Sequence, residues 1–131
     1  MHPLVTTVII SPNPQMANFV GKMHGGELLK LLDQVASATS RRYSRLYCVT
    51  AKILSVEYFD PIEIGSLVSV RGEIIKVGKT SMTVDIEVKQ ENMKTGEINI
   101  TNRAKFIMVA LNSNGRSTPV PQLENCNEID I

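Results

Sequence analysis

A single amphipathic helix, with strand-like sequence on both sides of it, is the feature that most constrains the fold of this 131-residue chain. From Gly25 to about Arg42, apolar side chains recur at helical spacing and fall on one arc when residues are placed about 100° apart. The arc contains Leu28, Leu31, Leu32, Val35, Ala36 and Thr39. A lone amphipathic helix must bury this stripe, and the strands elsewhere in the chain offer the surface for it.

The remaining segments have the patterns of strands. Val5–Ile10 is short and β-branched, and Leu46–Phe59 is long, with a change of parity near Ile53–Ser55 that predicts a β-bulge. Before that bulge, the side chains expected to share one face are Tyr47, Val49, Ala51 and Ile53. Three further strands with clean alternation are predicted around Val68–Ile74, Met82–Val88 and Asn102–Ala110. The pattern predicts an α+β fold, in which an antiparallel sheet has one face covered by the helix.

The stretch "TPVPQLENCNEIDI" has no periodicity and is predicted to be a poorly ordered tail. The domain is therefore placed at residues 1–121, followed by a flexible tail at 122–131. No linker or internal repeat divides the chain, and its length suits one core.

Composition excludes several classes of function. The net charge is +1 and aromatic residues make up 5% of the chain, so a surface for nucleic acid or anionic membrane is not expected. No apolar run approaches the ~20 residues that span a bilayer, and the first residues lack the pattern of a secretory signal. The expected location is the cytoplasm.

Metal, disulfide and nucleotide motifs are also weak. The two cysteines, Cys48 and Cys126, predict neither a disulfide framework nor a zinc site, and the two histidines cannot form an HExxH motif. "GKTS" at Gly78–Ser81 resembles the end of a P-loop. However, the position where a P-loop requires its first glycine holds Glu73, and the segment joins two predicted strands, whereas a P-loop opens a helix. It is predicted to be a β-turn, or a basic turn that touches a phosphate of a ligand.

The start of the helix is the strongest candidate for a site. Gly25 and Gly26 leave backbone amides uncovered at the positive end of the helix dipole, where a developing negative charge is stabilised. About two turns later, Asp33 offers a carboxylate on the shoulder of the apolar arc. The glycines could equally form a tight turn and Asp33 could be a solvated residue, so the residues alone suggest acyl-transfer or hydrolytic chemistry only weakly.

A resemblance to a known family strengthens this interpretation. It covers Val5 to Pro121 in one continuous order and rests on "NPQMANFVGKMHGGELLKLLDQVASATS", "VTAKILSVEYFDPIEIGSLVSVRGEIIKVGKTSMTVDIEV" and "FIMVALNSNGRSTPVP". Together these segments resemble the hotdog-fold acyl-CoA thioester hydrolases, in the cytosolic acyl-CoA thioesterase branch. The resemblance implies a hotdog fold, in which a curved antiparallel β-sheet wraps around one long central helix.

The resemblance also implies roles for individual residues. Asp33 matches the helix acid that serves as general base or nucleophile, and Asn18 matches a loop asparagine that faces this acid from the partner subunit. His24, Gly25 and Gly26 match the segment whose amides polarise the thioester carbonyl. The residues that match the turn near the pantetheine and phosphates of CoA are Lys76, Gly78, Lys79, Thr80 and Ser81, with Arg103 and Arg116 as weaker candidates. Lys22 departs from the family, where a smaller or polar residue is common.

The implied activity is hydrolysis of acyl-CoA to a free acid and CoA, with no metal and no cofactor other than the CoA of the substrate itself. The implied assembly is a homodimer whose sheets join edge to edge, with the active sites at the interface, and a hexamer built as a trimer of dimers. The alternative is a hotdog module that binds or senses acyl-CoA without hydrolysing it, although the presence of Asp33 and Asn18 argues against this. A hotdog dehydratase would require a histidine facing an acid, and His24 is poorly placed for that.

Overall fold

The structure is a computed structural model, and it describes residues 2–123. Each predicted helix and strand is present. The elements are β1 (Val5–Ile10), a short 3-10 turn (Pro14–Met16), α1 (Gly25–Ser44), β2 (Tyr47–Tyr58), β3 (Leu67–Val77), β4 (Ser81–Glu91) and β5 (Ile98–Leu111).

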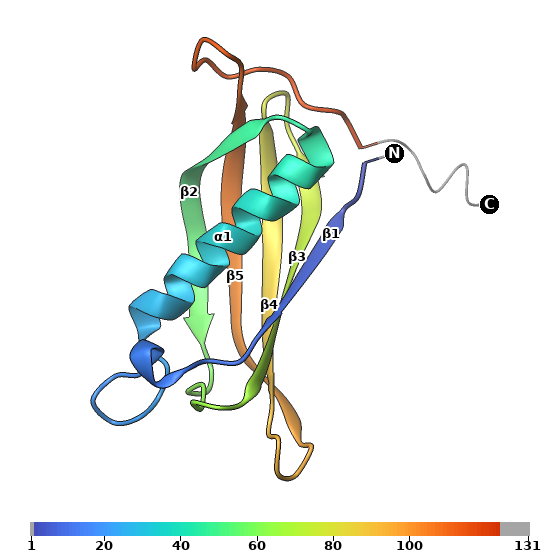
Figure 1. Cartoon of the computed structure of the whole chain (residues 1–131). Helices are drawn as coiled ribbons and strands as arrows, with labels where there is room; N and C mark the ends of the chain where they lie inside the picture. The colour runs from blue at the N-terminus through green and yellow to red at the C-terminus, as the bar shows by residue number, and fades with distance from the viewer. Residues whose placement is uncertain (1, 124–131) are drawn as a thin grey trace, which may run out of the picture.

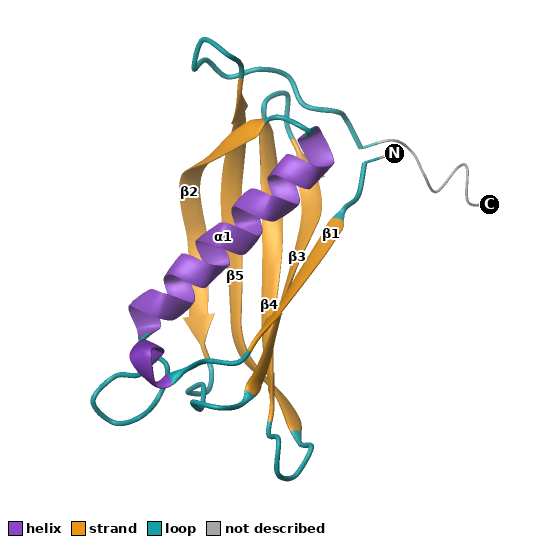
Figure 2. Cartoon of the chain, viewed as in Figure 1, coloured by secondary structure: helices purple, strands orange, loops and turns teal. Residues whose placement is uncertain are grey.

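The strands form one antiparallel five-stranded sheet in the order β1-β3-β4-β5-β2. Consecutive strands β3, β4 and β5 lie side by side, whereas β1 and β2 form the two edges. Helix α1 crosses one face of this sheet diagonally, and the sheet curves around it (Figures 1 and 2). The predicted hotdog architecture is confirmed.

The helix is held by the stripe that the sequence predicted. Leu28, Leu32 and Val35 are buried, while Leu31, at the edge of the predicted arc, is only half-buried. The stripe continues to Tyr43, which is 2% exposed. The helix ends at Ser44, and the following residue, Arg45, caps it in the left-handed conformation with φ 64°. The sheet residues that complete the core include Val70, Ile74, Val84, Ile86, Phe106 and Met108.

Strand β2 contains two irregularities where the sequence predicted one. The register against β5 shifts between Ile53 and Ser55, as predicted, and also between Thr50 and Lys52. The earlier shift turns the strand over, so that Tyr47 and Val49 lie on the outer face whereas Ile53 faces the helix. The prediction that Tyr47, Val49 and Ile53 share one face is wrong for this reason.

The C-terminal segment is more ordered than predicted. Val120 is 5% exposed and joins the core, and its N–H donates to the Lys79 carbonyl at 2.9 Å. The Thr118 N–H donates to the Ala110 carbonyl, and the Gln122 side chain donates to the Gly78 carbonyl. The expectation that the segment from Thr118 onward is poorly ordered is therefore wrong for residues 118–121. Most of the predicted tail, including Cys126, lies outside the described residues.

Gly72 on β3 lies where the helix packs closely against the sheet, and replacing it tests this close approach. A Cβ at this position would lie 2.5 Å from Thr39 Oγ1 and 3.0 Å from Val35 Cγ1, both on the helix. We expect Gly72→Ala to lower the free energy of unfolding by about 1–3 kcal/mol, because the helix must shift to admit the methyl group. Chemical denaturation measures this change.

Gly25→Ala is the control for Gly72→Ala, because a Cβ at Gly25 meets nothing within 4 Å. Its stability should match that of the unmodified chain or rise slightly. Equal stability of both variants would contradict the close contact between α1 and β3.

Candidate active site

The N-terminus of α1 is capped by the side chain of His24. The Nδ1 atom of His24 accepts a hydrogen bond from the Gly26 N–H at 3.0 Å, and the backbone of His24 has the extended conformation typical of a cap. The Gly26 amide, predicted to polarise a carbonyl, is thus engaged by the imidazole. Among the described residues, the Gly25 and Glu27 N–H groups make no hydrogen bond, so both amides at this terminus are open to a ligand.

Asp33 lies at the edge of the buried stripe, directly after Leu32, and its carboxylate points toward β2. The Thr50 hydroxyl donates to Asp33 Oδ1 at 2.5 Å, and within residues 2–123 this carboxylate makes no other hydrogen bond or ion pair. Both side chains are exposed in the single chain. One carboxylate oxygen is therefore held in place by β2, and the other is open for chemistry.

Thr50 is the functional candidate that the sequence did not reveal. Simple alternation along β2 places it on the face opposite Ile53. In the structure both residues face the helix side, because Thr50 pairs with Met108 and Ile53 pairs with Phe106 across the first bulge. The sequence marked Thr50 only as a polar β-branched residue before a bulge. Its contact with the helix becomes visible in the folded structure.

Asn18 closes the tight loop that precedes the helix. Its Oδ1 accepts from the Val20 N–H at 3.0 Å and from the Lys22 N–H at 3.1 Å, and its own N–H donates to the Lys22 carbonyl at 2.7 Å. Gly21 completes the turn with φ 83°, a conformation that favours glycine. The side-chain oxygen of Asn18 is thus used by its own loop, which leaves the Nδ2 amino group to donate elsewhere.

Asn18 and Asp33 are not brought together within one chain. Asp33 lies eight residues into the helix from Gly25, about 12 Å along the axis, whereas Asn18 precedes the helix, and no hydrogen bond joins the two side chains. A site that uses both groups needs a second copy of the chain or a different arrangement.

The turn at Gly78–Ser81 joins β3 and β4, as predicted. The Gly78 N–H donates to the Ser81 carbonyl at 2.9 Å, while the Thr80 and Lys79 carbonyls accept from Ala110 and Val120. Figure 1 shows this turn at the end of the sheet near the C-terminus of α1, far from the N-terminus of the helix. Lys76 lies just before it, opposite Thr83 on the outer face of the sheet.

The two arginine candidates lie in different places. Arg103 is on the outer face of β5, where its guanidinium pairs with Glu87 at 3.0 Å. It is six positions from Val109, the partner of Ser81, which corresponds to about 20 Å along the strand. Arg116 lies in the turn after β5, where its N–H donates to the Asn112 side chain. The fold of one chain does not bring Arg103 to the turn.

Within residues 2–123, no three His, Cys, Asp or Glu side chains gather in a way that could hold a metal ion. The one α-helix in this range is not apolar enough to cross a membrane.

Comparisons with known proteins agree on one family. The sequence model of the thioesterase superfamily matches residues 20–97. Protein VdlD of Helicobacter pylori is 45% identical over 118 residues, which cover 90% of this chain and 67% of the relative. A Bacillus subtilis protein named as an uncharacterised acyl-CoA thioester hydrolase, YkhA, is 34% identical and covers 90% of this chain and 69% of its own length. A crystal structure described as an apo-hexameric acyl-CoA thioesterase superposes with a TM-score of 0.89 at 32% identity, over 92% of this chain and 77% of the other.

The His24 cap generates a second prediction. His24→Ala removes the acceptor for the Gly26 N–H and should lower the free energy of unfolding by about 1 kcal/mol, whereas His24→Asn should restore most of the loss. Thermal and chemical denaturation measure both variants. A His24→Ala protein as stable as the unmodified chain would mean that the imidazole does not support the helix terminus.

Proposed function

The chain belongs to the thioesterase superfamily, and from that premise we propose that it hydrolyses acyl-CoA to a free carboxylic acid and CoA. The observation that carries the proposal is the contact between Asp33 and Thr50, which orients a carboxylate at the edge of the apolar stripe of α1. Relatives and a structural neighbour named as acyl-CoA thioester hydrolases or thioesterases support the same substrate class.

The proposed reaction begins at the free oxygen of Asp33. As a general base, the carboxylate removes a proton from water while the water oxygen attacks the thioester carbonyl carbon. The tetrahedral intermediate then collapses, the C–S bond breaks, and the CoA thiolate leaves and takes up the proton held by Asp33. As a nucleophile, Asp33 would attack the same carbon, the C–S bond would break with release of the CoA thiolate, and water would then hydrolyse the mixed anhydride to the free acid and the Asp33 carboxylate. Thr50 fixes the carboxylate orientation in either route.

The start of α1 from the partner subunit stabilises the negative charge that develops on the carbonyl oxygen, since Gly25 and Asp33 of one chain lie about 12 Å apart along the helix axis. The Gly25 N–H is open, and the positive end of the helix dipole lies at the same place. The Gly26 amide contributes indirectly, because its bond to His24 fixes the direction of the first helical turn. The Asn18 amino group is a second donor, positioned to hold the water or the carbonyl oxygen.

We further propose that two copies of the chain build each site. Strand β2 is 12 residues long and has a neighbour on one side only, so pairing of two β2 edges would join the sheets. Its exposed side chains include Tyr47, Ile53, Leu54 and Tyr58. The loop after Asn18 also presents Phe19 and Val20 to solvent, at 101% and 63% exposure. The hexameric neighbour supports assembly of three such dimers.

In this assembly, Asn18 of the partner subunit would approach Asp33. The turn Gly78–Ser81, with Lys76 and Lys79, would bind the pantetheine and phosphates of CoA, and Arg116 would add charge at the same end of the sheet. A second chain would also cover the Asp33–Thr50 pair, and removal from water would strengthen the electrostatic effect of that pair.

The alternative function is a module that binds acyl-CoA and does not hydrolyse it. Release of free thiol from acetyl-, hexanoyl- and palmitoyl-CoA separates the two functions, because a sensor binds CoA esters and releases no thiol. The same panel reports the preferred acyl chain length.

Asp33→Ala should abolish thiol release while CoA binding persists, because the carboxylate takes part in the reaction and does not bind CoA. Thr50→Val should lower kcat about ten-fold or more, since it removes a hydrogen bond to a charged group. Thr7→Val on the opposite edge strand is the matched control and should leave kcat unchanged. Undiminished turnover by Asp33→Ala would contradict the proposed chemistry.

Mixed oligomers test the shared site. Asn18→Ala and Asp33→Ala proteins should each be inactive or nearly so, and chains refolded or co-expressed as a mixture should regain about a quarter of the unmodified activity. That fraction arises because half of randomly formed dimers are mixed and one of their two sites is intact. No recovery in verified mixed dimers would place Asn18 and Asp33 in the site of a single chain.

A further inference from the structure

The loop that carries Asn18 is tied to the body of the protein by Lys22. The Lys22 ammonium lies between both carboxylate oxygens of Glu63, at 2.5 and 2.7 Å. The backbones of these two residues also pair as an isolated antiparallel bridge. The next residue adds a further bond, from the Met23 N–H to the Ile62 carbonyl at 2.8 Å. The loop before the helix is thus joined to the connection between β2 and β3.

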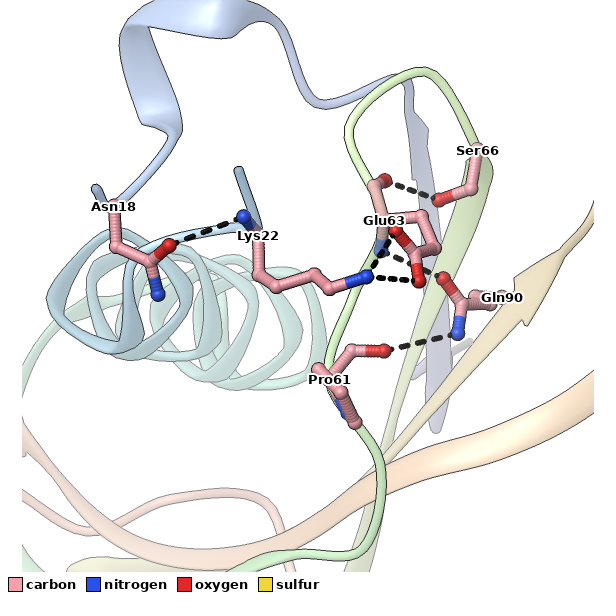
Figure 3. A network of polar contacts seen from close by, with 6 residues as sticks. All are labelled: Asn18, Lys22, Pro61, Glu63, Ser66 and Gln90. Carbon is pink, nitrogen blue, oxygen red and sulfur yellow. Dashed lines mark hydrogen bonds and ion pairs between the residues drawn. The ribbon is translucent and has the colours of Figure 1, made fainter. Parts of the chain in front are cut away.

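Glu63 is itself held by the sheet (Figure 3). Its N–H donates to the side-chain oxygen of Gln90 at 2.9 Å, and the Gln90 amino group donates to the Pro61 carbonyl at 3.1 Å. Gln90 is on β4 and is 8% exposed, so both ends of a buried amide are used to fix this connection. The Ser66 hydroxyl also donates to the Glu63 carbonyl at 2.8 Å. Glu63 therefore offers Lys22 a fixed partner.

Lys22 links this support directly to Asn18. Its N–H donates to Asn18 Oδ1 and its ammonium binds Glu63 (Figure 3). Its carbonyl also accepts from the Asn18 N–H. Because Asn18 Oδ1 is fixed by this backbone, the direction of the Nδ2 amino group depends on where Lys22 is held. No other side-chain ion pair in residues 2–123 reaches this loop.

We infer that Lys22 and Glu63 are positioning residues for Asn18 in the hydrolysis reaction, acting through an ion pair that fixes the loop against β4. The inference rests on the proposed function, since the amino group of Asn18 must take part in the reaction for its direction to affect turnover.

The effect on turnover should be modest, because the Lys22 and Glu63 side chains are 35% and 51% exposed. An exposed pair of this kind corresponds to about a two- to five-fold effect on an equilibrium or a rate. Arg71 and Glu73 form a comparable pair at 2.9 Å with 50% and 37% exposure, on β3 and away from the loop. This second pair supplies a matched control.

The experiment compares kcat at saturating hexanoyl-CoA for Lys22→Met, Glu63→Gln, Lys22→Arg and the control Arg71→Met. We expect Lys22→Met and Glu63→Gln to lower kcat about two- to five-fold, while Lys22→Arg and Arg71→Met stay near the unmodified value. Loss of the same size from Arg71→Met, or an undiminished kcat for both Lys22→Met and Glu63→Gln, would overturn the inference.

Salt gives a second readout that a purely structural role would not produce. Added salt screens an exposed ion pair, so kcat of the unmodified protein should fall toward that of Lys22→Met as ionic strength rises. The kcat of Lys22→Met itself should stay nearly constant over the same range. Parallel salt curves for the two proteins would contradict the inference.

Hydrogen exchange tests the loop without relying on activity. The Val20 and Lys22 amides, which donate to Asn18 Oδ1, should exchange about two- to five-fold faster in Lys22→Met than in Arg71→Met. Unchanged exchange would overturn the inference even if the protein hydrolyses acyl-CoA. If the unmodified protein releases no thiol but exchange changes as expected, the proposed function fails while the support of the loop by Lys22 stands.

Discussion

The packing of one helical stripe against one face of the sheet is the constraint on which the rest of the structure depends. Leu32 and Val35 on α1 are buried against the sheet, and Gly72 allows β3 to approach the helix closely. Because the stripe fixes the rotation of the helix, the neighbouring Asp33 is directed to the edge of the core, toward β2. A carboxylate at that edge is close to apolar surface and still open to a substrate.

The polar groups of the candidate site share one property. In each, one atom is fixed by the chain and another is left open, as judged within residues 2–123. Thr50 holds one oxygen of Asp33, the Asn18 oxygen is used by its own loop, and His24 engages Gly26 while Gly25 remains open. Groups held in this way are oriented before the substrate arrives, which reduces the reorganisation needed during the reaction.

The sequence allowed prediction of the helix and all five strands. Helix α1 and strands β3, β4 and β5 each bury one face and so have a clear period, whereas β1 was predicted from its β-branched residues. Asp33 became a candidate through its position beside the apolar stripe together with the resemblance to the thioesterases, and its role stays a prediction. The contact with Thr50 could not be predicted, because the bulge between Thr50 and Lys52 reverses the alternation that sequence reasoning relies on. Val120 was missed for a related reason, since a single buried residue between two prolines has no period.

The most direct test of the account is the structure of the assembled protein with a non-hydrolysable acyl-CoA thioether ketone. We predict that the carbonyl carbon lies beside Asp33 of one chain, while the carbonyl oxygen lies about 3 Å from the Gly25 N–H of the partner subunit and Asn18 of the partner subunit reaches the same site. A carbonyl bound away from the helix terminus, or a site completed by Asn18 of the same chain, would contradict the central claim that two chains share one hydrolytic site.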